Sequence, residues 1–247
     1  MLKYHKLISL VWGLTFLIVL QTFSTPEPIF RFLIPAFIGY TALVTLYNVW
    51  YLKQIDKYNF WIILRPILLL LSGFGLFLII PSDLLRGSFL IVSVGVIAFF
   101  EIILGNFAEN FLLNETLLIA FGLFFLFFAF YHYLPNYQTY YLAGIFFGSA
   151  LLTRSFYEFV PKSSRVKLIG AVTIGLFCSQ LYWTLNFLQF HFSALSLILF
   201  NIFYFCLILN YYFLFHILNF KKIQFHLLLI LICSVVVLIS TPWQILK

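Results

Sequence analysis

Nine long apolar runs follow one another along this chain of 247 residues, and each is close to the length needed to cross a lipid bilayer. A soluble domain of this size cannot bury so many apolar runs without exposing large apolar patches. With 64% hydrophobic and only 9% charged residues, the chain has room for short loops but not for a separate soluble domain. The sequence therefore predicts one integral membrane domain over residues 1–247.

Charges, prolines and polar clusters mark the ends of the predicted spans. They place nine spans at residues 7–24, 31–52, 60–80, 88–107, 112–134, 140–160, 168–188, 193–219 and 225–245. Backbone N–H and C=O groups need partners in hydrocarbon, and these runs lack the alternation of a membrane β-barrel strand. The predicted fold is an all-α, polytopic transmembrane helical bundle in contact with the lipid bilayer.

Basic residues predict the orientation, because short cytoplasmic loops of membrane proteins are enriched in lysine and arginine. If the N-terminus is cytoplasmic, the inner loops carry nine basic residues, namely Lys3, Lys6, Lys53, Lys57, Lys162, Arg165, Lys167, Lys221 and Lys222. The outer segments then carry three, namely Arg31, Arg86 and Lys247. This difference predicts a cytoplasmic N-terminus and an external C-terminus.

The first apolar run also resembles a secretory signal, since Lys3, His5 and Lys6 precede an apolar stretch over 7–20. The residues after it, Gln21 to Pro26, are a poor match to the small-residue pattern of a cleavage site. We therefore expect the first span to be retained.

Motifs for known chemistry are missing from the sequence. It has no HExxH pair, no paired aspartates and no glycine-rich phosphate loop, and its three cysteines lie singly inside apolar runs. The basic residues are scattered among loops and do not form one face for nucleic acid. We expect no metal, no cofactor and no nucleic-acid partner, and an enzyme is the less favoured class.

Three charged residues lie inside apolar runs, and Glu101 is the strongest candidate for a functional site among them. An ionised carboxylate at membrane depth costs several kcal/mol unless it is protonated, paired or exposed to water. Arg65 and Arg154 are its candidate partners. Both arginines lie five or six residues from the cytoplasmic ends of their spans, so their long stems are also expected to reach the interface.

A polar cluster follows Glu101, and it includes Asn106, Glu109 and Glu115. Two interpretations are open. These residues terminate two helices, with Glu115 near the positive end of the fifth span. Alternatively, Glu101, Glu109 and Glu115 are acidic neighbours that hold a proton or a cation.

Arg154 and Glu158 are four residues apart, so they share one helical face. They form an ion pair with each other, or each meets a charge on another helix.

Small residues in two spans predict close helix packing: Gly144 and Gly148 in the sixth span, and Ala171 and Gly175 in the seventh. A contact between these two small-residue strips is one of the arrangements that we expect.

Two stretches, Phe99 to Asn110 and Trp183 to Leu188, resemble uncharacterised multi-pass membrane proteins of candidate-phylum bacteria. The resemblance covers the second half of the chain. It implies a bacterial inner (plasma) membrane and carries no activity with it.

Three functions are compatible with these patterns. The favoured one is a small carrier or accessory membrane protein that handles a proton, an ion or a small solute through the residues around Glu101. The first alternative is a membrane-embedded enzyme that acts on a lipid or isoprenoid substrate. The second alternative is a scaffold that binds other membrane helices through Gly144 and Gly148.

Overall fold

The structure is a computed structural model that describes residues 2–24, 30–80, 83–104, 109–188, 190–215 and 220–240. These residues form nine α-helices and two short 3-10 helices, without a β-strand. The α-helices are α1 (Leu2–Ser24), α2 (Phe30–Gln54), α3 (Phe60–Ile79), α4 (Asp83–Ile103), α5 (Glu109–Tyr133), α6 (Gln138–Phe156), α7 (Ser164–Leu185), α8 (Phe192–Leu214) and α9 (Phe220–Ser240). The 3-10 helices are η1 (Pro135–Tyr137) and η2 (Tyr157–Phe159).

The all-α helical bundle predicted from the sequence is confirmed. Seven of the helices described, α1 to α5, α7 and α8, are long and apolar enough to cross a membrane. The apolar part of α9, Ile223–Val237, is shorter. The bounds differ from the predicted spans by up to five residues, as at the start of α4 and the end of α8. At α7, which begins at Ser164, the difference brings Lys167 into the first turn.

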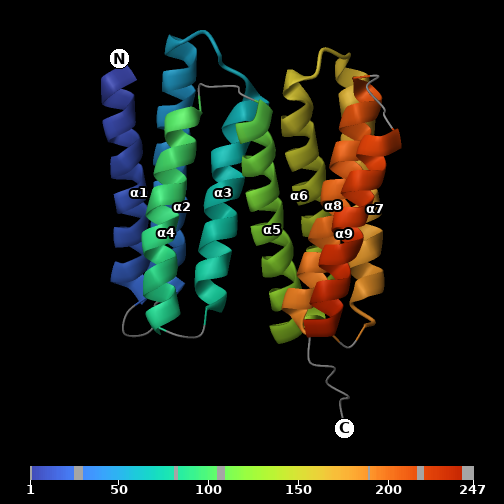
Figure 1. The fold of residues 1–247 in the computed structure, drawn as a ribbon. Helices are drawn as coiled ribbons and strands as arrows, with labels where there is room; N and C mark the ends of the chain where they lie inside the picture. The colour runs from blue at the N-terminus through green and yellow to red at the C-terminus, as the bar shows by residue number, and fades with distance from the viewer. Residues whose placement is uncertain are drawn as a thin grey trace. The chain divides into compact units, whose positions relative to one another are not determined.

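The chain divides into two compact units, residues 1–111 and residues 112–247. In the first unit, α1 packs most closely against α4 (Figure 1). Gly13 explains this approach, because a Cβ atom built there would lie 2.7 Å from the backbone oxygen of Val94. Helices approach one another this closely only where a side chain is absent or small.

The turn from α2 to α3 is fixed by two residues. Asp56 has a φ of 52°, in the left-handed region that Asn and Asp tolerate better than most residues. Asn59 then starts α3, where its side chain accepts a hydrogen bond of 3.0 Å from the Trp61 backbone N–H. The turn lies at the same end of this unit as the beginning of α1 (Figure 1).

In the second unit, α6 and α7 are the closest pair. A Cβ atom built at Gly175 would lie 2.9 Å from both the Ala150 Cβ and the Phe146 backbone oxygen of α6. The glycines of α6 face α5 instead: a Cβ atom at Gly144 would overlap the Phe127 ring, and one at Gly148 would touch Leu123. The strip on α7 therefore packs against α6, whereas the two glycines of α6 do not meet it.

Basic residues gather at one end of each unit. In the first unit Lys6, Lys53 and Lys57 lie at the end that holds the start of α1 and the α2–α3 turn. In the second, Lys162 and Lys221 lie at the end where α6 meets α7 and where α9 begins. Such clustering is expected if lysine and arginine are enriched in the loops on one side of the membrane. The side of the membrane that each end faces stays a prediction.

Candidate functional site

Glu101 lies in the last turn of α4, and it is 2% exposed. Its Oε1 atom accepts a hydrogen bond of 3.0 Å from Nδ2 of Asn48, a fully buried residue of α2. A carboxyl group with so little access to water depends on hydrogen bonds from the protein for its stability. The Asn48 amide is therefore a main determinant of the properties of Glu101.

His5 of α1 joins the same group of helices through the backbone of Glu101. Its Nε2 atom lies 2.9 Å from the Glu101 carbonyl oxygen, and its Nδ1 atom lies 2.9 Å from the Tyr47 hydroxyl. A carbonyl oxygen only accepts, so Nε2 carries the proton and, in the neutral ring, Nδ1 accepts from Tyr47. The Tyr51 ring stacks on His5 with a centroid distance of 3.6 Å, which fixes the plane of the imidazole. We call Glu101, Asn48, His5 and Tyr47 the Glu101 network.

The Asn48 side chain is compatible with both protonation states of the carboxyl group. Its Oδ1 atom has no hydrogen-bond partner among the residues that the structure describes. Because the two ends of an amide have nearly the same shape, a rotation of about 180° exchanges Oδ1 and Nδ2 at little steric cost. In one orientation Nδ2 donates to a carboxylate, and in the other Oδ1 accepts from a carboxylic acid.

A cavity of about 240 Å³ lies beside the network, between the first turns of α1 and the last turns of α2. His5 and Tyr47 form part of its wall, together with Tyr4, Trp50 and Gln54. Tyr4 and Gln54 are exposed, so the cavity connects the end of the unit with two members of the Glu101 network. This space is large enough for several water molecules.

Arg154 and Glu158 form the ion pair that their spacing allows, across the end of α6 and the start of η2. The backbone oxygen of Glu158 also accepts a hydrogen bond of 2.9 Å from Nζ of Lys167. Arg154 is 5% exposed and Lys167 is buried as well. The Glu158 carboxylate pairs with the first cation and the Glu158 backbone oxygen accepts from the second, and both cations are shielded from water. The ion pair and the Lys167 contact hold the α6–α7 turn in place.

We expect a double-mutant cycle on Arg154→Gln and Glu158→Gln to give a coupling energy of about 1 kcal/mol or more, because the two charges are in contact and largely shielded. The measurement is the free energy of unfolding in mixed detergent and dodecyl sulfate micelles. The control cycle pairs Arg154→Gln with Asp56→Asn in the other unit, and its effects should add. If the effects in the first cycle were additive, the Arg154–Glu158 ion pair would not contribute to the stability of the protein.

The other predicted charged residues come from α3 and α5. Arg65 is in α3 and is 2% exposed, and Glu115 is buried in the second turn of α5. Glu109 is the first residue of α5, but its side chain lies outside the description, and Asn106 lies outside the described residues altogether. The interpretation of Glu101, Glu109 and Glu115 as acidic neighbours stays a prediction.

The expectation that Arg65 and Arg154 reach the interface is wrong. Both guanidinium side chains are buried in the protein, because the helices around them cover their stems and leave no path to solvent. Burial of an arginine requires compensating charges or hydrogen bonds, as the Arg154–Glu158 pair illustrates.

Three members of the Glu101 network were missed by the sequence reasoning. Asn48 is one amide in a long apolar run, His5 stands among the lysines at the start of the chain, and Tyr47 has the appearance of an interfacial aromatic. A signal for Asn48 was present, because Val44, Asn48 and Leu52 recur every four residues and so share one helical face. Asn48 and His5 are buried, and Tyr47 is partly buried.

No family model, curated protein or solved structure matches this chain. The seven long apolar helices within the described ranges identify it as a multi-pass membrane protein, and its own residues are the basis for any more specific function.

Proposed function

We propose that this protein is a small proton-handling membrane carrier in which Glu101 binds the proton. The observation that carries the proposal is the contact between the buried Glu101 carboxyl group and the Asn48 amide. Fixed hydrogen-bond donors are the best partners for a carboxylate with a purely structural role. The Asn48 amide, whose Oδ1 atom has no partner among the described residues, can instead donate to the charged carboxylate or accept from the neutral acid.

Access to the site supports the same function. The cavity opens from the end of the unit to His5 and Tyr47, of which His5 bonds to the backbone oxygen of Glu101 and Tyr47 bonds to His5. Intramembrane carboxyl groups of this kind are rare and costly, and they commonly mark proton or ion pathways. The proposal includes a bacterial inner membrane, with the N-terminus in the cytoplasm, as the setting in which a proton gradient is available.

The alternative of a helix-binding scaffold has less support, because Gly144 and Gly148 already face α5 within their own unit. The surface of α6 that would bind a helix of another protein is therefore already covered by α5. The lipid-enzyme alternative stays a prediction, since no contact described here assigns a reacting atom.

The test is infrared difference spectroscopy of the reconstituted protein on acidification, together with proton uptake into liposomes driven by a potassium diffusion potential. We expect the wild type to gain the carbonyl stretch of a carboxylic acid, sensitive to ¹³C-glutamate labelling. Glu101→Gln should lose this band and reduce proton uptake to that of empty liposomes. Glutamine keeps the size and one hydrogen bond of the site, so the variant is expected to fold.

Asp56→Asn is the matched control, because it removes an exposed carboxyl group and should leave band and uptake unchanged. A band without uptake would assign Glu101 as the proton-binding group of a carrier that moves protons only with a second solute. An unchanged band in Glu101→Gln would overturn the proposal, since Glu101 would then exchange no proton.

A further inference from the structure

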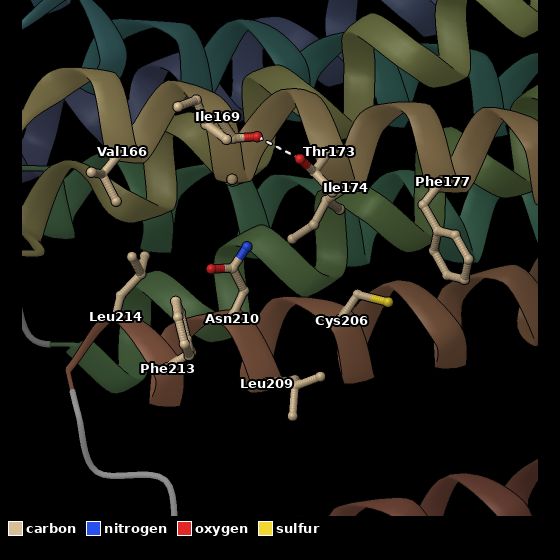
Figure 2. Close-up of a pocket in the computed structure, with 11 residues that line it drawn as sticks. Val166, Ile169, Thr173, Ile174, Phe177, Cys206, Leu209, Asn210, Phe213 and Leu214 are labelled. Atoms are coloured by element: carbon tan, nitrogen blue, oxygen red, sulfur yellow. Dashed lines mark hydrogen bonds between the residues drawn. The ribbon is translucent and has the colours of Figure 1, made fainter.

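An apolar groove of about 550 Å³ runs between α7 and α8, in the other unit from the Glu101 network (Figure 2). It extends from Val166 to Phe177 on α7 and from Leu214 to Cys206 on α8. At 1.5 Å per residue, the α7 side of the groove is about 17 Å long. This length is close to half of the roughly 30 Å hydrocarbon core of a bilayer, which is the depth of one leaflet.

Asn210 and Thr173 carry the hydrogen-bonding side chains that line this groove. Figure 2 shows the Asn210 amide pointing from α8 toward α7, and Gly170 leaves it room, because a Cβ atom there would lie 3.0 Å from Asn210 Nδ2. Asn210 makes no hydrogen bond with any residue in the described part of the chain, whereas Thr173 donates to the Ile169 oxygen. A hydrogen-bonding occupant would therefore stabilise this half-buried amide in its apolar surroundings.

The charges at the end of the groove indicate the chemistry of this occupant. Val166 and Leu214 lie where the basic residues of this unit gather, with exposed Arg165 directly before Val166 and exposed Lys221 at the start of α9. At this end, the acidic residues whose side chains are described are Glu158, which is paired with Arg154, and Glu115, which is buried in the second turn of α5. The end of the groove thus carries an excess of positive charge.

We propose that the groove holds one acyl chain of an anionic phospholipid, with the headgroup phosphate at Arg165 and Lys221. Asn210 lies four residues, or about 6 Å, before the basic end of α8. This depth matches the interfacial layer where lipid ester groups lie, about 5 to 7 Å thick. The amide would then donate to an ester carbonyl, while the apolar walls contact the chain below it.

The test is a native mass spectrometry titration of the delipidated, full-length protein with phosphatidylglycerol. Phosphatidylcholine with the same chains tests the headgroup, and glycerol phosphate tests the headgroup without chains. We expect one phosphatidylglycerol to bind more tightly than one phosphatidylcholine, and glycerol phosphate to bind far more weakly than either. Equal binding of the two lipids by the wild type would overturn the proposal.

Two variants, each with a control, distinguish the contribution of the basic residues to lipid binding from that of the groove. Arg165→Gln should weaken phosphatidylglycerol binding about fivefold and weaken phosphatidylcholine binding less, because the choline cation offsets the charge of the phosphate. Lys6→Gln in the other unit should change neither. Thr173→Trp fills the groove from an exposed position and should weaken both lipids, whereas Thr184→Trp, exposed on α7 outside the groove, should not.

Asn210→Leu provides a readout that adds no bulk to the groove, since the two side chains have similar size. Loss of one interhelical or lipid hydrogen bond in a membrane is worth about 0.6 kcal/mol, so binding of phosphatidylglycerol should weaken about threefold. Unchanged helix content and elution volume show that a variant is folded. If folded Thr173→Trp and Asn210→Leu both bind phosphatidylglycerol as the wild type does, the lipid is held by surface charge alone and the groove assignment fails.

Discussion

Gly13→Leu should destabilise the protein by at least about 1 to 3 kcal/mol, the usual cost of forcing bulk into a packed contact. The substituted Cβ atom would lie 2.7 Å from a backbone oxygen of α4, and backbone cannot rotate away as a side chain can. We therefore expect α1 to move away from α4, which also lengthens the His5 contact with the Glu101 carbonyl. The free energy of unfolding in mixed micelles measures the effect.

Gly95→Leu is the matched control, because Gly95 stands next to Val94 on the partner helix and a Cβ atom there meets nothing within 4 Å. Its effect should stay within about 0.5 kcal/mol, as for other exposed substitutions. Equal tolerance of leucine at both positions would show that α1 and α4 are not in close contact through Gly13.

Tyr182→Ala is expected to have the largest effect in the second unit, a loss of about 3 to 5 kcal/mol. The Tyr182 ring is fully buried on α7 and packs on Phe128 of α5 with a centroid distance of 4.6 Å. Its hydroxyl group donates a hydrogen bond of 3.0 Å to the Phe127 backbone oxygen. Removal of the ring leaves a cavity between the two helices and removes this interhelical hydrogen bond.

Two further variants divide this effect into parts. Tyr182→Phe keeps the ring and should cost only about 0.6 kcal/mol, the average value of a hydrogen bond between membrane helices. Trp183→Ala, at the next and exposed position, removes a larger ring and should change the free energy of unfolding little. If Trp183→Ala costs as much as Tyr182→Ala, the burial of Tyr182 between α5 and α7 is not what stabilises this unit.

The sequence predicts elements of this protein better than it predicts their contacts. Apolar length alone locates the helices, and a charge in an apolar run is enough to single out Glu101. The rotation of each helix about its axis is set by packing in three dimensions, which explains why the two glycines of α6 face α5 and not α7. For the same reason Asn48 and His5, which come from distant parts of the chain, could not be assigned to Glu101 in advance.

The bond from His5 to the Glu101 carbonyl has a consequence for the end of α4. The last carbonyl groups of a helix lack donors in their own helix. Within the described residues, the Leu104 N–H donates a long bond of 3.3 Å to the Glu101 carbonyl. His5 therefore acts as a C-cap of α4 that another helix supplies. The turn that positions the carboxyl group consequently depends on the first residues of the chain, and any N-terminal extension that unwinds the start of α1 would fray α4 at Glu101.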